Sequence, residues 1–385
     1  MKLSRILAAT ALAGVIATPA FAGATLKSVM NTGSKGKLKV TAGGQINQAF
    51  IVVGDGESVE PGFVMNDASS TRFFFKFDGK FGNGFKAGGK LEAEFEYNAS
   101  DKWENDDKLV GSNSNGDFFN LRYADIYIKY NDTVKLSIGQ GDTATNKTLE
   151  SDLSGTKNVA YANVDAFLEE KEVVIKGIGP VAEIEDFLFA EDGQSRQMRA
   201  RLDVYLGESG FKLSASTGQT SSNDGRDDPL FYDIAVSYKG KFGDTKVKAA
   251  AGHVFNFEND EDVSVTDISA SVLFGNGFNV TGAWERVHYD MAGVEDSDLF
   301  FVKLGYQTDA ICDWGTSALA VSYARGDDME GADDREGNDI ASAFAQDIDA
   351  VGAEWYLGYH HYWFDFPGVD IESINAGITG VKIKF

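Results

Sequence analysis

The sequence predicts an all-β protein that forms a roughly 16-stranded antiparallel transmembrane β-barrel. One loop is expected to fold inward and narrow the barrel. Three observations lead to this fold class. Short segments alternate apolar and polar residues with period two. Short glycine-centred connections alternate with long acidic ones. The amino terminus reads as an export signal, yet no later segment approaches the roughly 20 apolar residues of a membrane helix. A membrane-spanning chain without such helices must close its strands into a barrel, because lipid offers no partner to an open strand edge.

The first segment, residues 1–22, has the pattern of a secretory signal peptide. Lys2 and Arg5 precede an apolar run at 6–18, and Ala20-Phe21-Ala22 supplies a small-x-small cleavage site. The alternative is a buried N-terminal helix. We therefore expect residues 23–385 to form a single barrel domain.

Composition and charge exclude several functions. Removing Lys2 and Arg5 leaves 33 basic against 59 acidic residues, a net charge of −26. This acidity argues against nucleic-acid binding and favours a weak to moderate cation preference in a pore. The single Cys312 excludes an internal disulfide framework. With 43 Gly and 5 Pro, the chain suits many strands joined by tight turns.

Alternation of apolar and polar residues marks the strands. In residues 72–77 three phenylalanines share one face, and in 91–97 glutamates alternate with apolar residues. Segment 120–130 has large residues on both faces, which could reflect a strand covered outside by a neighbouring subunit. We expect strands near 38–53, 70–80, 86–98, 118–130, 133–140, 170–178, 196–206, 211–219, 230–240, 244–257, 262–274, 277–290, 297–308, 315–326, 347–360 and 371–385.

The connections come in two lengths. The sequence FGNGF occurs at both 81–85 and 274–278, and Asn-Gly is a strong hairpin signal because both residues tolerate positive φ. The long connections, at 101–116, 223–228, 258–262, 291–298 and 326–347, are acidic. Short turns at one end and long loops at the other are typical of outer-membrane barrels.

Segment 139–165 differs from the rest of the chain. It follows a strand-like run but has neither strand nor helix periodicity, and it is rich in Thr, Ser, Asn and Gly. A loop this long in a compact domain is usually functional or disordered. We interpret it as a loop that enters the lumen and narrows it; the alternative is an exposed surface loop.

The chain resembles the general-diffusion porins of Gram-negative bacteria, in particular their alphaproteobacterial branch. The resemblance covers essentially the whole chain and rests on the order and spacing of several motifs. These are GGQINQAF at 43–50, SSTRFFFKFDGK at 69–80, NLRYADIYIKY and LSIGQGDTAT within 120–145, SRQMRARLDVYLGESGFKLSAS at 195–216, and the terminal GITGVKIKF. The resemblance implies a trimeric barrel whose third loop forms an eyelet, with basic wall residues facing loop acids.

Carried onto this sequence, the inward loop is about 143–165. Its acidic candidates are Glu150, Asp152 and Asp165, and the basic wall candidates are Arg72, Arg122, Arg199 and Arg201. Opposed charges across a narrow pore create a transverse field that orients polar solutes. Each arginine could instead form a wall salt bridge without effect on conductance. The acidic segment 171–193 either adds acids to the eyelet or lengthens the outer loops.

The residues do not favour an enzyme. The four histidines, His253, His288, His360 and His361, lack zinc-site spacing, and no G-x-S-x-G elbow or phosphate-binding glycine loop occurs. We expect no cofactor. The acids at 327–339 suit Ca²⁺, but they lack EF-hand spacing, which favours the alternative of a solvated charged loop. Divalent ions that bridge this loop to lipopolysaccharide are a related expectation.

The function predicted is passive diffusion of small hydrophilic solutes and ions across the outer membrane. Expected partners are those solutes and ions, outer-membrane lipid and lipopolysaccharide, and further copies of the chain in a homotrimer. Two alternatives stay open. A substrate-specific sugar porin would need a ladder of aromatic residues along the lumen, and a non-conducting adhesin or structural barrel would act through its acidic loops.

Overall fold

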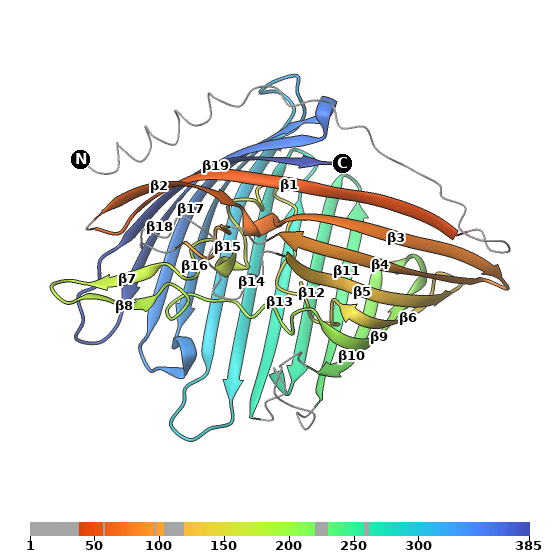
Figure 1. Cartoon of the computed structure of the whole chain (residues 1–385), viewed down its shortest axis with the longest axis horizontal. Coiled ribbons are helices and arrows are strands. Elements are labelled where there is room, and N and C mark those ends of the chain that lie inside the picture. Colours follow the sequence, from red (N-terminus) through yellow and green to blue (C-terminus); the bar gives the residue numbers. More distant parts are fainter. Residues whose placement is uncertain (1–37, 57, 96–97, 104–118, 220–229, 258–261) are drawn as a thin grey trace.

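The structure is a computed structural model of the whole chain. It describes all residues except 1–37, 57, 96–97, 104–118, 220–229 and 258–261. The predicted signal peptide and its cleavage site lie outside the described residues. Figure 1 shows one large sheet that curves back on itself around a lumen crossed by irregular segments.

The elements alternate strands with turns along the whole described chain. The strands are β1 (Leu38–Gly54), β2 (Val59–Met65), β3 (Thr71–Gly82), β4 (Phe85–Phe95), β5 (Phe119–Tyr130), β6 (Val134–Gly141), β7 (Glu172–Ile175), β8 (Gly179–Glu183), β9 (Gln197–Tyr205), β10 (Phe211–Gln219), β11 (Phe231–Phe242), β12 (Thr245–Phe255), β13 (Val263–Leu273), β14 (Phe278–Tyr289), β15 (Ser297–Thr308), β16 (Ser317–Asp327), β17 (Glu336–Ile348), β18 (Ala353–Asp365) and β19 (Ile374–Lys384). Short 3₁₀ turns include η1 (Asp67–Ser69) and η2 (Val164–Ala166). No helix among the described residues is long and apolar enough to cross a membrane.

All barrel strands pair antiparallel with their neighbours, and β1 pairs with β19 to close the sheet. Strands β2 and β3 both pair with the same side of β1, end to end, so they form one barrel strand interrupted at η1. Counted this way, the 17-stranded sheet is a closed barrel of sixteen strands. The predicted fold class is confirmed.

Closure of the barrel depends on a glycine. Gly44 and Phe385 exchange backbone hydrogen bonds of 2.9 and 3.0 Å where the two ends of the sheet meet. A Cβ atom at Gly44 would lie 2.6 Å from the carbonyl oxygen of Arg72 and 2.7 Å from the Phe385 ring. A larger residue would therefore collide with both sides of the seam.

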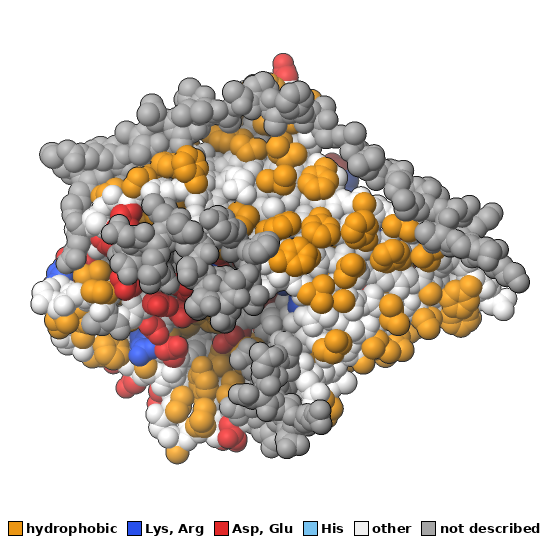
Figure 2. Space-filling model, in the orientation of Figure 1, with side chains coloured by type: hydrophobic (Ala, Val, Ile, Leu, Met, Phe, Trp, Pro, Cys, Tyr) orange, Lys and Arg blue, Asp and Glu red, His pale blue; other side chains and the backbone are white. Residues whose placement is uncertain are grey.

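The two faces of the wall differ as a membrane barrel requires. Large apolar side chains such as Ile126, Leu304 and Val321 are exposed on the outer face. Polar side chains such as Ser269, Lys303 and Glu285 are buried on the opposite face. Figure 2 shows hydrophobic side chains spread over the outer surface of the strands. This alternation is the expected arrangement between lipid and an aqueous lumen.

The strand count agrees with the prediction only because two errors cancel. The expected barrel strand at 170–178 is wrong: β7 lies there but pairs with β8 in a separate two-stranded sheet outside the barrel, and its further contact is an isolated bridge from Ile175 to Ile371. The expected acidic loop at 326–347 instead contains barrel strand β17. Alternate residues of β17 are the small, inward Ala341, Ala343 and Ala345, whereas Ser342 lies outward, so its hydrophobic alternation is weak.

A β-bulge explains the ambiguous pattern of 120–130. The pairing of β4 with β5 shifts register between Glu92 and Ala93, opposite Arg122. Before the bulge the odd-numbered residues of β5 point outward, and after it the even-numbered residues do. Leu121 and Ile126 therefore both lie on the outer face, where Ile126 is 68% exposed. A bulge re-aims side chains in this way. Large residues on both faces therefore need no neighbouring subunit as their explanation.

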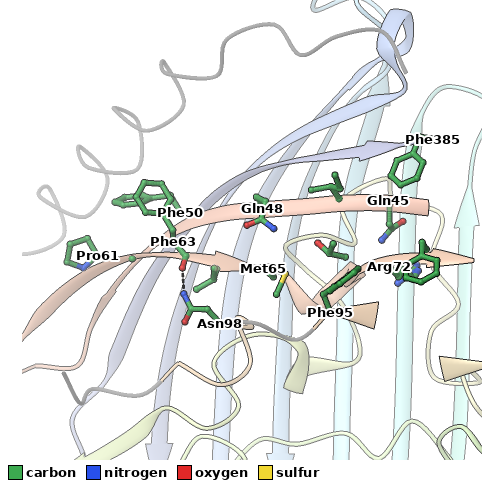
Figure 3. A pocket seen from close by; sticks show the side chains of 15 residues that line it. Gln45, Gln48, Phe50, Pro61, Phe63, Met65, Arg72, Phe95, Asn98 and Phe385 are labelled. Atoms are coloured by element: carbon green, nitrogen blue, oxygen red, sulfur yellow. Dashed lines mark hydrogen bonds between the residues drawn. The ribbon is translucent and has the colours of Figure 1, made fainter. Parts of the chain in front are cut away.

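The interruption between β2 and β3 leaves a groove of about 970 Å³ in the wall. Figure 3 shows Phe50, Phe63, Phe95 and Phe385 around it, with Arg72 at one end. At the interruption, a side chain replaces the missing backbone hydrogen bonds. The Thr71 hydroxyl accepts from the backbone N–H of Asn47 (3.0 Å) and donates to the Asn47 carbonyl (3.2 Å).

Candidate pore constriction

The segment between β6 and β9, residues 142–196, runs along the inner wall of the barrel. Its first part is attached to polar side chains that point inward from successive strands. Thr145 donates to Asp233 of β11 from both its backbone N–H and its hydroxyl, each at 2.8 Å. The Thr148 hydroxyl donates to Asp267 of β13. Further along the loop, the N–H groups of Ser151 and Leu153 donate to Ser269 and Ser271 of β13, both at 3.0 Å. The wall acids satisfy loop donors that have no strand partner.

The next part of the loop reaches the last strands of the barrel. Lys303 of β15 donates to the carboxylate of Asp152 and to the carbonyl of Ala160 (2.7 Å). His360 of β18 lies 3.1 Å from the carbonyl of Val159. Further contacts at Asn158 come from Asn66 (2.7 Å), Lys382 of β19 (2.9 Å) and Glu354 of β18. Residues 143–160 thus follow the inner wall from β9 and β10, which contact Thr143 and Ala144, to β19.

The returning part of the loop, 171–196, forms the β7–β8 hairpin and then runs to β9 along the inner wall. Lys171 forms a buried ion pair with Asp55 beside β1 (3.0 Å). Glu285 of β14 accepts the N–H groups of Glu191 and Asp192, both at 2.8 Å. The acids of 171–193 therefore divide into two sets. Glu191 and Asp192 attach the loop to the wall, whereas Glu183 and Asp186 lie with the outer loops, where Asp186 approaches Arg335 (3.9 Å).

The pKa values of two buried loop acids, Asp152 and Asp192, are shifted in opposite directions. Burial alone would raise the pKa of Asp152, but the Lys303 ammonium beside it holds that pKa below its usual range. Burial raises the pKa of Asp192 well above its usual range, and the neighbouring Glu150, Asp267 and Glu285 raise it further. Asp152 is therefore a charged anchor, whereas Asp192 favours its protonated form.

Arg72 and Arg122 meet on the inner wall of β3–β5. Arg122 pairs with Glu92 (3.2 Å) and Glu94, and Arg72 donates to the Ser70 hydroxyl (3.0 Å). The bulge described above directs Arg122 to this side. Both arginines lie on the inner face, and Arg122 has glutamates of its own wall as partners.

Arg199 and Arg201 hold the root of the loop. Arg199 donates to the carbonyls of Gly139 (3.0 Å) and Asp142 (2.9 Å) and pairs with Asp125 (2.8 Å). Its side chain is only 3% exposed. Arg201 pairs with Asp203 (2.9 Å) and donates to the carbonyl of Thr143. The Arg199 guanidinium is thus buried at the root of the loop, where its partners are backbone carbonyls and Asp125.

The remaining loop acids are Glu150 and Asp165. Lys157 lies 3.8 Å from the Glu150 carboxylate, and Lys248 of β12 donates to the Glu150 carbonyl (3.0 Å). Glu150 is half-buried. Asp165 lies within η2, and its side chain is not among those described.

Five residues that hold the loop in place were not identified from the sequence. They are Lys303, Asp233, Asp267, Glu285 and Arg196. Four of them are single charged residues on the polar face of a strand, which period-two alternation places in the lumen without naming a partner. Arg196 lies just before β9 and pairs with Asp142 (3.3 Å). The partner of each lies far along the chain, so spacing could not reveal the pairs.

The described residues contain no group of three or more His, Cys, Asp or Glu side chains that could hold a metal ion. Acids within 327–336 instead form ion pairs with arginines. Glu336 pairs with Arg325 (2.9 Å), and Glu330 pairs with Arg335 (2.6 Å). His360 is buried between Asp339 (2.9 Å) and the loop, whereas His361 points to the other face and contacts Asn375 (3.0 Å). The two adjacent histidines therefore lie on opposite faces, as predicted.

Comparison with solved structures shows the same fold in outer-membrane proteins. The anion-selective porin from Comamonas acidovorans is 14% identical, with a TM-score of 0.61 over 90% of this chain and 100% of that one. The trimer form of OmpT from Vibrio cholerae is 16% identical, with a TM-score of 0.56 over 90% and 99%. The channel DcaP of Acinetobacter baumannii is 14% identical, with a TM-score of 0.55 over 90% and 97%. No curated protein sequence matches this chain.

A family model settles the class to which the chain belongs. The model described as Gram-negative porin matches residues 8–365, which is nearly the whole chain. It agrees with the closed barrel of sixteen strands, with the apolar outer face and with the polar lumen. The family indicates a channel rather than an enzyme, located in the outer membrane. The chain thus belongs to the Gram-negative porin family, as an outer-membrane β-barrel for passive diffusion.

Proposed function

We propose that small hydrophilic solutes and ions cross the barrel between the loop 143–165 and the inner wall of β3–β5. The observation that carries this proposal is the one-sided attachment of the loop. The wall contacts of residues 143–160 fall on β9–β19 and on Asn66, whereas Arg72 and Arg122 lie on β3 and β5. The passage therefore has a loop edge and a basic wall edge.

The charges at these two edges give the passage a transverse field. The wall contributes Arg72 and Arg122, partly offset by Glu92 and Glu94. The loop contributes Glu150, partly offset by Lys157. Fixed charges of opposite sign in a narrow pore orient dipolar solutes and disfavour apolar ones. We assign the pore-facing basic role to Arg72 and Arg122, and a loop-holding role to Arg199 and Arg201.

The overall acidity of the chain supports a weak to moderate cation preference, since a negative mouth concentrates cations. The test is the reversal potential of the purified protein in a planar bilayer under a potassium chloride gradient. A potential of the sign produced by cation flow supports the proposal. Anion preference overturns it, as does the same permeability ratio for wild type and Glu150→Gln. Arg286→Gln on the outer face is the control, because Arg286 pairs with Asp298 outside the lumen.

We also propose that the chain acts as a homotrimer. Its structural relatives include a protein described as a trimer form. The groove beside β2 and β3 is aromatic, yet its floor carries Gln45, Thr71 and Arg72. Such a polar floor suits another protein surface better than acyl chains, so we place a second copy of the chain there. Mass measurement of the detergent-solubilised protein tests the trimer, and Phe63→Glu, at a 75% exposed groove residue, should release monomers.

Catalysis is not proposed. Membership of the porin family supports a channel function. We expect outer-membrane lipid and lipopolysaccharide to surround the apolar outer face rather than to serve as substrates. Release of fatty acid or peptide fragments by the purified protein would contradict this.

A further inference from the structure

Four lysines stand side by side at the end of the barrel where the turns are short. Lys80 of β3 is directly opposite Lys86 of β4, Lys86 is opposite Lys129 of β5, and Lys129 is opposite Lys135 of β6. We call Lys80, Lys86, Lys129 and Lys135 the lysine row. It crosses four adjacent strands without interruption.

The lysine row faces the lumen. Period-two alternation puts Lys135 on the same face as Ser137, which is 1% exposed inside the barrel. The intervening Ile128 and Leu136 are 52% and 44% exposed on the lipid side. Lys86 and Lys135 are half-buried and Lys80 is exposed, as expected for side chains around an aqueous vestibule.

Such a row opposes the stability of the sheet, because like charges directly opposite on neighbouring strands repel. Two carboxylates offset part of this charge. Asp132 lies 2.6 Å from Lys86 and 3.2 Å from Lys129, and Asp203 of β9 is directly opposite Lys135. Lys80 and Lys135 make no ion pair with a carboxylate among the described residues. Lys135 instead lies 5.0 Å from the centre of the Tyr127 ring. The row therefore keeps an excess of positive charge toward the lumen.

A second set of lysines lies at the same end of the barrel. Lys239 of β11 is opposite Lys248 of β12, and Lys241 is opposite Lys246. In outer-membrane barrels the short turns lie on the periplasmic side. The opposite end carries acids, including Glu183, Asp186 and Asp327. The charge of the lumen therefore changes sign along its axis.

We propose that the lysine row forms a binding site for small polyvalent anions, such as phosphate-bearing solutes, in the periplasmic vestibule. Several ammonium groups around one aqueous space attract a multiply charged anion more strongly than chloride. Phosphate oxygens also suit lysine, whose ammonium acts as a compact point charge with three donors. The inference rests on the proposed channel for access to the site, but the charges themselves do not depend on conduction.

The experiment uses inorganic pyrophosphate as probe in a planar bilayer. Pyrophosphate added on the side of the short turns should reduce single-channel current at about tenfold lower concentration than when it is added on the side of the long loops. The double variant Lys80→Gln, Lys135→Gln should weaken this block roughly tenfold. Asp132→Asn should strengthen the block, because it removes the carboxylate that pairs with Lys86 and Lys129. Lys176→Gln, in the outer hairpin where Lys176 pairs with Asp370, is the matched control and should leave the block unchanged.

The outcomes separate the two proposals. Conducting channels blocked equally from both sides, or blocked equally in the lysine and control variants, overturn the anion site while the channel stands. A wild type that inserts without conducting overturns the channel. In that case calorimetric titration of pyrophosphate into the detergent-solubilised protein still decides the site: heat that disappears in the double variant supports it, and heat that persists overturns it.

Discussion

The ammonium group of Lys303 on β15 donates to the carboxylate of Asp152, 151 residues earlier in the chain. Both side chains are buried, with 0% and 3% exposure. A lysine and an aspartate inside a protein are stable only when each has the other and additional hydrogen-bond partners. Lys303 also donates to the Ala160 carbonyl, and Asp152 accepts from the Ser154 N–H (2.6 Å). This pair fixes the middle of the inward loop to the barrel wall.

Replacing Lys303 with Met should release the loop. The change leaves Asp152 buried without its cation, which costs about 3–5 kcal/mol. We expect a lower unfolding temperature, faster protease cleavage within 143–165 and noisier single-channel current. The double variant Lys303→Met, Asp152→Asn should recover part of the stability, because no buried charge remains. Equal stability of the single variant and the wild type would show that the pair does not hold the loop.

The lumen arginines should divide into two functional groups. Arg72→Gln should raise the cation-to-anion permeability ratio on the order of twofold, which corresponds to about 0.4 kcal/mol of pore potential. Arg199→Gln should change that ratio little but lower the unfolding temperature, because the carbonyls of Gly139 and Asp142 lose their donor. Reversal potentials and thermal unfolding of the two variants provide the check. The assignment is wrong if Arg199→Gln shifts selectivity as much as Arg72→Gln.

Loop attachment should weaken as pH rises. The pKa of Asp192 is raised by burial and by Glu150, Asp267 and Glu285, so the folded state binds a proton that the unfolded state releases near pH 4. The resulting stability is complete below that pH and is lost as pH climbs through the raised pKa. Unfolding temperatures measured from acidic to alkaline pH should therefore fall more steeply for the wild type than for Asp192→Asn.

Asp142 provides the control for this prediction. Although burial opposes it, the positive charges of Lys147 and Arg196 hold the pKa of Asp142 below its usual range. Asp142 stays charged above neutral pH, so Asp142→Asn should lower stability without changing the slope. Identical slopes for the wild type and Asp192→Asn would contradict the role given to Asp192.

Gly44→Ala should impair barrel closure. The added methyl group would lie 2.6 Å from the Arg72 carbonyl, and overpacking of this kind costs about 1–3 kcal/mol. Folded barrel resists sodium dodecyl sulfate, so the variant should show a smaller heat-modifiable fraction on gels after refolding. Gly282→Ala is the matched control, since its Cβ would have no neighbour nearer than 3.8 Å. A similar folded fraction in both variants would remove the steric argument.

Much of the fold could be predicted from the sequence because membrane barrels repeat one signal. Alternation at 72–77 and 246–255, together with Asn-Gly turns, places strands within a few residues of their bounds in the structure. The signal fails where one face lacks large apolar residues, as in β17 with its inward alanines. It also fails where a short apolar run forms a hairpin away from the wall, as in β7. The interruption of the second strand at η1 has no periodic signature.

The site was predictable only in part. The length of segment 139–165 and its lack of periodicity distinguished it as a loop. Strand parity placed Arg199 and Arg201 on the polar face of their strand, whereas Arg72 and Arg122 were assigned to the lumen by resemblance to the porins. Which charges pair could not be predicted, since Lys303 and Asp152 meet only after the barrel closes. The burial of Arg199 depends on where the root of the loop turns, at Gly139 and Asp142. Such tertiary contacts leave no trace in local sequence patterns.

The central claim is that the lumen conducts past the inward loop, and single-channel recording in a planar bilayer tests it most directly. Purified wild-type protein, recorded under a salt gradient, should produce discrete ohmic steps in groups of three, with a reversal potential of the sign expected for cation preference. Protein that inserts as folded barrels but remains silent would contradict the account, because residues 143–165 would then form a plug rather than a constriction.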